Sequence, residues 1–339
     1  MRILTFGRSG LRVSHLFLGT MTFGTSWGWG AQPEECRKMF DAYAEAGGNV
    51  IDTANAYTEG ESERIVGELL GAERDRFVVM TKYSVTLDGT DPNASGNHRK
   101  SLVRSLEQSL TRLRTDYVDL LWVHIWDPLT PIEETMRALD DVVRAGKVLY
   151  VGISDTPAWV ISRANTLAEW HGWTPFVGLQ LPYSLIQRHI ERELFPMADV
   201  LGLSVAAWSP LAGGVLSGKF TRSVEEGPTR VAHTGTAIDD RDLSIAREVD
   251  AVSDELGASS SQVALAWTMA HHPSLHPIVG ARRIDQLLDN LAAADLDLPE
   301  EAVRRLDEVS AIERGFPLDM IDSSKDFVYG AVADRISQR

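Results

Sequence analysis

Cysteine is almost absent from this chain, since Cys36 is the single cysteine among 339 residues. A lone cysteine cannot form an internal disulfide, and Cys36 falls on the apolar stripe of a predicted helix, where a small buried side chain is expected. This usage is typical of a reducing cytoplasm, where we expect the protein to reside. It does not favour a secreted domain held by disulfides.

Long apolar runs and a basic charge balance are also missing. No stretch approaches the ~20 apolar residues of a membrane span, and the opening MRILTFGRSGLRVSHLFLG has neither a sustained apolar core nor a small-residue cleavage site. The formal net charge of −15 disfavours nucleic acids and anionic membranes as partners, because both attract basic surfaces. We expect a soluble, unprocessed protein in which any anionic cofactor requires a local basic patch.

Metal-site patterns are absent as well. A metal-dependent barrel hydrolase would need histidines and carboxylates clustered at strand ends, and the nine histidines form no such cluster. His271 and His272 are adjacent, so they point to different faces, and they are expected at a helix end before Pro273. We predict no metal ligands.

Strand and helix patterns alternate almost from end to end, which is typical of βαβ units with a parallel sheet. The eight candidate strands are Leu16–Thr20, Asn49–Thr53, Phe77–Lys82, Val118–His124, Val148–Ser154, Phe176–Gln180, Leu203–Trp208 and Pro277–Gly280. Eight strand–helix pairs predict one α/β domain over residues 1–339, a (β/α)8 TIM barrel with lid loops at its carboxyl-terminal face. Its active site is expected at the carboxyl ends of the strands.

Helical spacing is clear between the strands. Apolar residues repeat at i, i+3, i+4 and i+7 in two segments, Cys36, Met39, Phe40 and Tyr43 in one and Leu102, Val103, Leu106 and Leu110 in the other. A further helix is expected to open with a capping box of Thr130 and Glu133 around Pro131, and to close at Gly146. Its apolar residues Ile132, Met136, Leu139 and Val143 face one way.

Three segments lack regular patterning, namely Val85–Asn97, Thr221–Asp240 and Arg314–Arg339. Loops of this length are usually lids or disordered, and all three are placed where they can overhang one barrel mouth. We predict lids for two of them and a flexible tail from about residue 314.

Four polar residues lie at the ends of three consecutive predicted strands: Asp52, Tyr57, Lys82 and His124. Carbonyl reduction needs a proton donor stronger than an unperturbed tyrosine, whose pKa is about 10. A lysine charge beside the ring lowers that pKa, an aspartate keeps the lysine charged, and a histidine orients the carbonyl and shares the proton load.

Each of the four also has a simpler interpretation. Asp52 fits a helix cap, Tyr57 and His124 fit buried core polar groups, and Lys82 fits a surface residue. A glycosidase carboxylate pair is disfavoured, because Asp52 is better explained as the partner of Lys82. Their shared position at strand ends favours catalysis.

With these residues placed on a barrel, the chain resembles the aldo-keto reductase family from about Met1 to Ala311. The matching motifs are RILTFGRSGLRVSHLFLGTMTFG, IDTANAY, TKYS, DYVDLLWVH and PIVGARRIDQLLDNL. The stretches GISDTPAW and AAWSPLAGGVLSGKF most resemble the aryl-alcohol dehydrogenase-like branch of bacterial and fungal members.

The resemblance implies an NADPH/NADP+ cofactor across the barrel mouth without a Rossmann fingerprint, and no G-x-G-x-x-G opens a helix after the first strand. It makes Asp52, Tyr57, Lys82 and His124 the catalytic residues. Residues implied for the nicotinamide are Ser154, Asp155, Gln180 and Trp208; for the pyrophosphate Ser209, Leu211, Gly213 and Lys219; for the adenosine Gly280, Arg282, Gln286 and Asn290; and for the floor near the ribose Gly19 and Thr20.

Several of these positions have structural alternatives. Trp208 fits core packing, Gly213 fits a turn, and the pair Gln286 and Asn290 fits the solvated side of a helix. The family usually has Asn at Asp155 and Ser or Thr at Ala281. Ionised Asp155 can only accept hydrogen bonds, so it either serves the carboxamide nitrogen and favours the oxidised ring, or caps a helix beginning near Pro157.

The implied activity is reversible, NADPH-dependent reduction of aldehydes or ketones that are aromatic or otherwise bulky. A nucleotide-sensing regulatory subunit, of the kind that accompanies potassium channels, resembles the same fold and is the alternative. The substrate is not indicated, because the lid loops that select it carry the least pattern. The oligomeric state is likewise not indicated.

Overall fold

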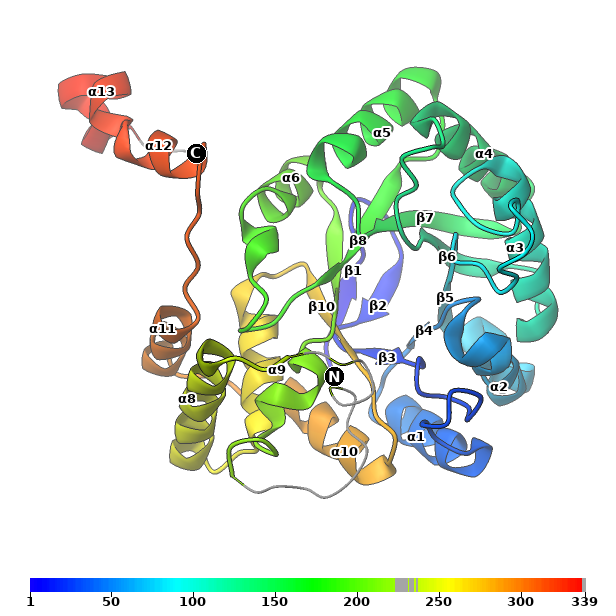
Figure 1. The fold of residues 1–339 in the computed structure, drawn as a ribbon, viewed down its shortest axis with the longest axis horizontal. Coiled ribbons are helices and arrows are strands. Elements are labelled where there is room, and N and C mark those ends of the chain that lie inside the picture. The colour runs from blue at the N-terminus through cyan, green and yellow to red at the C-terminus, as the bar shows by residue number, and fades with distance from the viewer. Residues whose placement is uncertain (223–230, 232–234, 236, 337–339) are drawn as a thin grey trace.

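The computed structural model describes residues 1–222, 231, 235 and 237–336, and it forms a closed barrel (Figure 1). Eight parallel strands follow the order β10-β3-β4-β5-β6-β7-β8-β9 around the barrel. They are β3 (Phe17–Gly19), β4 (Val50–Asp52), β5 (Val78–Tyr83), β6 (Val118–Val123), β7 (Val148–Ser154), β8 (Phe176–Pro182), β9 (Ser204–Trp208) and β10 (Leu275–Val279). The predicted TIM barrel is confirmed.

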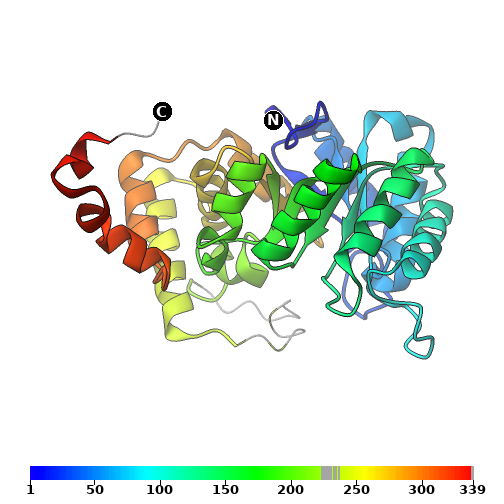
Figure 2. The same cartoon turned by 90° about the horizontal axis from the view of Figure 1, so that it is seen from above.

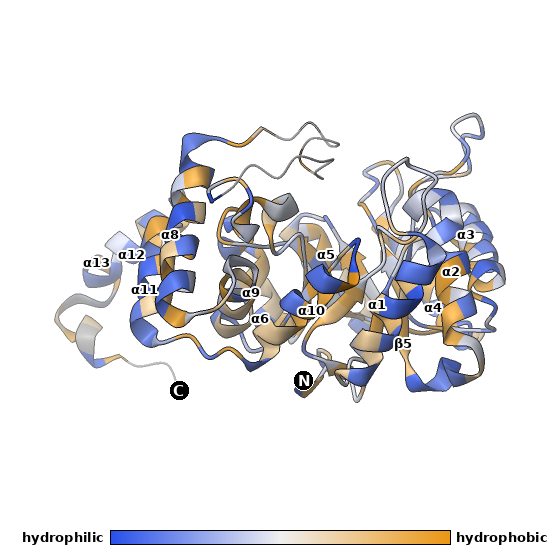
Figure 3. Ribbon diagram, turned by 90° about the horizontal axis from the view of Figure 1, so that it is seen from below, coloured by the Kyte–Doolittle hydropathy of each residue, from blue (hydrophilic) through white to orange (hydrophobic). Residues whose placement is uncertain are grey.

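Helices cover the outside of the barrel, with polar residues outward and apolar residues toward the strands (Figure 3). They are α1 (Pro33–Glu45), α2 (Glu61–Leu70), α3 (Arg99–Leu113), α4 (Ile132–Arg144), α5 (Ala158–His171), α6 (Leu194–Leu201), α8 (Asp240–Leu256), α9 (Ser260–His271), α10 (Ile284–Ala292) and α11 (Glu300–Val309). Short 3₁₀ segments include η1 (Tyr57–Gly60), η2 (Gly71–Arg76), η3 (His189–Glu191), η4 (Ala212–Ser217) and η5 (Ala293–Asp295). No helix in the described ranges is long and apolar enough to cross a membrane.

An antiparallel hairpin precedes the barrel and was not predicted. It consists of β1 (Ile3–Thr5) and β2 (Arg12–Ser14), which lie at the end of the barrel opposite the loop of residues 85–97 (Figure 2). Phe6 and Val13 of this hairpin are fully buried in one cluster with barrel-interior residues. The hairpin therefore closes the amino-terminal end and leaves the carboxyl-terminal end for the site.

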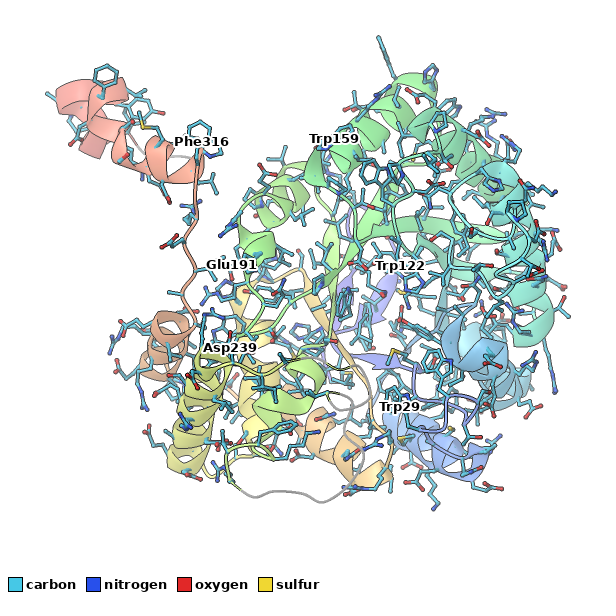
Figure 4. All side chains as sticks on the ribbon, in the orientation of Figure 1. Trp29, Trp122, Trp159, Glu191, Asp239 and Phe316 are labelled. Atoms are coloured by element: carbon cyan, nitrogen blue, oxygen red, sulfur yellow. The ribbon has the colours of Figure 1, made fainter. Side chains whose placement is uncertain are left out.

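Large aromatic side chains fill the barrel interior. Trp122 is fully buried inside the ring of strands (Figure 4), and it meets Phe6 edge to face at 6.2 Å between ring centroids. A Cβ added at Gly152 would lie 2.3 Å from Trp122, and one at Gly178 would lie 2.4 Å from Phe6. These two strands need glycine because the aromatic rings occupy the space of a side chain.

The buried helix faces predicted from the apolar spacing are confirmed, with one exception. The α1 residues Cys36, Met39, Phe40 and Tyr43 are all buried. In α3 the prediction for Val103 is wrong, because this side chain is 42% exposed. The buried face there runs through Leu102, Leu106 and Leu110 with intervening serines, and Val103 lies about 100° away from Leu102 around the helix.

The predicted capping box at α4 is also wrong. Pro131 is the N-cap and no side chain caps the helix. The hydroxyl of Thr130 instead donates to Asp127 Oδ2 at 2.6 Å, so it points back along the loop. The predicted end is confirmed, since α4 stops at Arg144 and Gly146 follows with a left-handed φ of +73°.

The C-terminal tail, residues 314–336, turns away from the barrel as α12 (Leu318–Ser323), α13 (Lys325–Tyr329) and η6 (Gly330–Arg335) (Figure 1). Its aromatic residues Phe316 and Phe327 are 88% and 94% exposed, so they pack on nothing in the barrel. The sequence left open whether this segment overhangs the mouth, and its described residues, 314–336, do not. Most of the predicted lid Thr221–Asp240 lies outside the described residues.

Candidate active site

A cavity of about 1030 Å³ opens at the carboxyl ends of the barrel strands. Its walls contain almost all of the predicted site residues: Gly19, Asp52, Tyr57, His124, Ser154, Asp155, Gln180, Trp208, Ser209, Leu211, Gly213, Lys219, Gly280, Arg282, Gln286 and Asn290. Thr20 and Lys82 do not line the cavity and lie beneath the residues of its wall. Across the described ranges, no three His, Cys, Asp or Glu side chains gather as metal ligands would.

Asp52 and Lys82 form a buried ion pair beneath the cavity. The Lys82 Nζ lies 2.6 Å from Asp52 Oδ1, and the two side chains are 0% and 3% exposed. The second carboxylate oxygen, Oδ2, accepts a hydrogen bond from Gln180 Nε2 at 2.8 Å. Both oxygens of Asp52 are thus engaged, which fixes the carboxylate and satisfies the charge that burial would otherwise penalise.

The Lys82 ammonium faces Tyr57. Nζ donates to the Thr53 carbonyl at 2.8 Å as well as to Asp52, and it lies 4.6 Å from the centroid of the Tyr57 ring. Burial alone lowers the pKa of Lys82, but attraction to Asp52 and Tyr57 outweighs burial and leaves the pKa above its ordinary value. Lys82 is therefore a charged group at neutral pH.

A strained turn presents Tyr57 to the cavity. Thr58, Glu59 and Gly60 follow it with left-handed φ values of 45°, 56° and 80°. The Thr58 hydroxyl donates to the Phe23 carbonyl at 2.7 Å and accepts from the Ser62 amide at 3.0 Å. These bonds hold a conformation that a β-branched residue disfavours, and so they set the position of the tyrosine.

His124 completes the group at the end of β6. Its ring meets the Tyr57 ring edge to face, with 6.0 Å between centroids and 82° between planes. Burial, with a smaller effect from Lys82, lowers the pKa of His124 to about 3. The imidazole is therefore neutral at pH 7 and is suited to orient an oxygen as a neutral donor; that it shares the proton load stays a prediction.

Asp155 and Trp208 meet at the cavity wall. The Trp208 Nε1 donates to Asp155 Oδ1 at 3.2 Å. The alternative that Asp155 caps the following helix is wrong, because α5 begins at Ala158 with Pro157 as its N-cap and no capping side chain. Trp208 is not simply core packing either, since it lines the cavity.

The turn after β9 brings backbone close to the cavity. Ser209, Ala212, Gly213 and Gly214 all have positive φ, at 53°, 49°, 67° and 97°. A Cβ added at Gly214 would lie 2.4 Å from Lys219 Nζ, so the lysine crosses directly over this glycine. Turns of this kind expose backbone amides beside a cation, which suits a bound anion.

At the other end of the cavity, Arg282 lies over the Trp29 ring, 5.9 Å from its centroid. The Arg282 amide donates to Gln286 Oε1 at 3.2 Å, and Asn290 is buried in the same wall. Gln286 and Asn290 thus line the cavity, which removes the alternative of a solvated helix side.

Sequence reasoning missed the loop between β3 and α1. Met21, Thr22, Trp29 and Gly30 of this loop line the cavity. Glu61 fastens it, because its Oε2 accepts bonds from the backbone amides of residues 25 and 26 at 2.8 and 3.1 Å. The sequence feature that could have indicated this loop is the tryptophan- and glycine-rich run TSWGWG, which follows shortly after a predicted strand.

Thr20 and the loop Val85–Asn97 were predicted near the site, but they do not form the wall of this cavity. The Thr20 hydroxyl donates to the Asp52 carbonyl at 3.0 Å and contacts Ser62, so it supports the strand end from behind. The loop Val85–Asn97 extends beyond the carboxyl end of the barrel (Figure 2), but its residues Leu87 and Ala94 line a separate hollow of about 400 Å³ beside α3.

Comparison with known proteins agrees with this architecture. The model of the aldo/keto reductase family matches residues 15–311. A norsolorinic acid reductase of Aspergillus flavus is 39% identical over 332 residues, covering 94% of this chain and 83% of that protein. An NADP(+) aryl-alcohol dehydrogenase of Phanerodontia chrysosporium is 37% identical over 338 residues, covering 94% and 88%.

A probable aryl-alcohol dehydrogenase of Saccharomyces cerevisiae is 37% identical over 301 residues, covering 85% of this chain and 91% of that protein. The resemblance drawn from the motifs, including the aryl-alcohol dehydrogenase-like branch, is therefore confirmed. Family model, relatives and barrel agree over nearly the whole chain. This chain belongs to the aldo/keto reductase family of oxidoreductases.

Proposed function

We propose that this protein uses NADPH to reduce aldehydes or ketones that are aromatic or otherwise bulky, and that it runs the reverse oxidation of alcohols at the same site. The observation that carries the proposal is the arrangement around Tyr57. Its ring has a charged ammonium 4.6 Å from its centroid on one side and a neutral imidazole ring on the other. A phenol in this setting is a proton donor for a carbonyl oxygen.

Each residue around Tyr57 has its own role in proton transfer. Tyr57 and His124 both donate hydrogen bonds to the substrate oxygen, and Tyr57 transfers its proton as the carbonyl becomes an alcohol. Lys82 has three N–H donors, of which Asp52 and the Thr53 carbonyl take two, so the third is available to the tyrosinate oxygen that proton transfer leaves. NADPH, when bound, supplies the hydride.

The cavity fits a dinucleotide by the chemistry of its walls. Lys219 and Arg282 provide cations in a chain whose formal net charge is −15, and the positive-φ turn at Gly213 offers backbone to a pyrophosphate. Gln180 gives its amide nitrogen to Asp52, which leaves its oxygen for the amino group of a carboxamide. We assign Arg282 to the 2′-phosphate that distinguishes NADPH from NADH.

Aromatic side chains support a bulky substrate. Tyr57 and Trp208 line the cavity together with His124. Flat aromatic walls favour flat aromatic ligands, and the relatives named above act, by their names, on aryl alcohols and norsolorinic acid.

A panel of aldehydes, ketones and sugars, assayed by loss of NADPH absorbance, tests the proposal. Aromatic aldehydes should give the highest kcat/KM, and NADPH should be preferred to NADH. Tight cofactor binding with no turnover of any carbonyl in the panel would instead support the nucleotide-sensing subunit.

A further inference from the structure

Asp155 places a carboxylate in the cavity wall next to Trp208. It follows β7 directly and adopts a left-handed φ of +43°, which turns its side chain into the cavity. Asn and Asp adopt this conformation at low cost, so the backbone accepts either residue. The difference between them is the negative charge.

Among the residues that the structure describes, no contact requires that charge. Helix α5 receives no side-chain cap, and the nearby Thr156 hydroxyl donates to the Ser154 carbonyl rather than to Asp155. The hydrogen bond from Trp208 Nε1 needs only an oxygen acceptor, which an amide also offers.

The charge is also poorly neutralised. In the described chain, Asp155 has no cation among its hydrogen-bond partners, and the nearest influence, Lys82, already pairs with Asp52 at 2.6 Å. Burial raises the pKa of Asp155, while hydrogen bonds from Trp208 and Ser154 and the more distant Lys82 oppose this rise. A partly buried carboxylate of this kind attracts a cation that enters the cavity.

We propose that Asp155 makes the site discriminate between the two redox forms of the cofactor, holding NADP+ more tightly than NADPH. This inference rests on the proposed function. The two forms differ in charge only at the nicotinamide ring, which is cationic when oxidised and neutral when reduced. Trp208, assigned to stack on that ring, is bonded to Asp155 through its indole edge, which brings the carboxylate to the same end of the cavity.

The consequence concerns the direction of the reaction. NADPH, when bound, would supply a hydride to the carbonyl carbon while Tyr57 gives its proton to the oxygen, and the oxidised cofactor would then carry a positive charge on its nicotinamide. A carboxylate beside it stabilises this outcome and therefore favours carbonyl reduction over alcohol oxidation on the enzyme. It also slows departure of NADP+.

Isothermal titration of the full-length protein with NADP+ and NADPH at pH 8, for wild type and Asp155→Asn, tests the inference. The variant should raise the Kd for NADP+ about fivefold and leave that for NADPH within about twofold. Asp289→Asn is the matched control, because it removes one carboxylate from the same cavity at α10, beside the adenosine half that both forms share. It should move both constants equally.

Melting temperatures of both variants establish that they are folded. An Asp155→Asn protein that is folded and keeps the wild-type ratio of the two Kd values would overturn the inference while leaving the proposed function intact. Failure of wild type to bind either form would overturn the proposed function, and the inference with it.

Discussion

At the residue scale, each side chain around Tyr57 acts through a partner that the barrel brings to it. Lys82 is fully buried, so its charge depends on Asp52, and Asp52 in turn is held by Gln180, 128 residues further along the chain. Removing one partner of such a pair leaves an uncompensated buried charge, which is typically costly. Catalysis and stability are therefore coupled in these residues.

Arg282 tests the cofactor assignment. Charge-assisted hydrogen bonds contribute roughly 1.5–3 kcal/mol each, so Arg282→Ala should raise the Kd for NADPH by about one to two orders of magnitude and barely change that for NADH. Fluorescence titration with both cofactors measures this. Arg283→Ala is the comparison, because Arg283 pairs with Asp285 at 3.0 Å, and it should have the smaller effect. Equal weakening of both cofactors by the Arg282 variant would make Arg282 a structural residue.

Individual residues could be predicted where local sequence determines them. Asp52, Tyr57, Lys82 and His124 were found because strand ends are visible in the apolar pattern. The bonds from Gln180 to Asp52 and from Trp208 to Asp155 could not be, because each joins strands whose relative register depends on the closed barrel. The neutral state of His124 follows from burial, which the sequence does not display.

At the element scale, the turn η1 after β4 controls the geometry of the site. It contains non-glycine residues with left-handed φ at Thr58 and Glu59, a conformation that costs of order 1–3 kcal/mol per residue and persists where surrounding bonds impose it. The two hydrogen bonds of the buried Thr58 hydroxyl are such bonds. The position of Tyr57 is thus determined by a short segment and its anchor.

Thr58→Ala removes both bonds and leaves two buried backbone groups without partners. We expect a loss of about 1–3 kcal/mol in the free energy of unfolding, measured in urea, together with a lower kcat because Tyr57 shifts. Thr58→Ser keeps the hydroxyl and removes the β-branch, so it should stay close to wild type in both respects. Equal effects of the two substitutions would show that the hydroxyl does not anchor the turn.

The elements themselves were predictable to different degrees. All eight barrel strands are short apolar runs bounded by polar residues, and they occur where predicted within a few residues. The hairpin of β1 and β2 was missed because three-residue strands carry little pattern. The α4 cap was wrong because Thr130 had a competing acceptor, Asp127, three residues back.

At the scale of the whole molecule, two buried histidines make stability depend on pH. His15 is 3% exposed and His276 is fully buried, and their rings meet edge to face at 5.9 Å. Burial, with a smaller effect from Arg2, lowers the pKa of His15 to about 4; burial, with a smaller effect from His15, lowers that of His276 to about 3. Both are neutral in the folded protein at pH 5, whereas an unfolded histidine with a pKa near 6.5 is charged.

The folded protein therefore binds fewer protons than the unfolded chain below pH 6.5, and its stability falls as the pH drops from 6.5 toward 4. Between pH 7 and pH 5 these two histidines together should lower the free energy of unfolding by on the order of 4 kcal/mol, measured in urea at each pH, and His124, whose pKa burial also lowers to about 3, adds a loss of similar size per residue. His276→Phe keeps the stacking on Phe17 and removes one titrating group, so the loss of stability between pH 7 and pH 5 should shrink by on the order of 2 kcal/mol. An unchanged pH dependence in this variant would contradict the assignment to His276.

The central claim is that Tyr57 is the proton donor of an NADPH-dependent carbonyl reductase, and Tyr57→Phe tests it most directly. Reduction of an aromatic aldehyde should lose roughly 10²–10⁴-fold in kcat, the usual contribution of a general acid, because the ring remains and only the acidic hydroxyl is lost. The Kd for NADPH, measured by fluorescence titration on the same preparation, should stay within about twofold of wild type. A Tyr57→Phe protein that keeps a near-wild-type kcat would contradict the account.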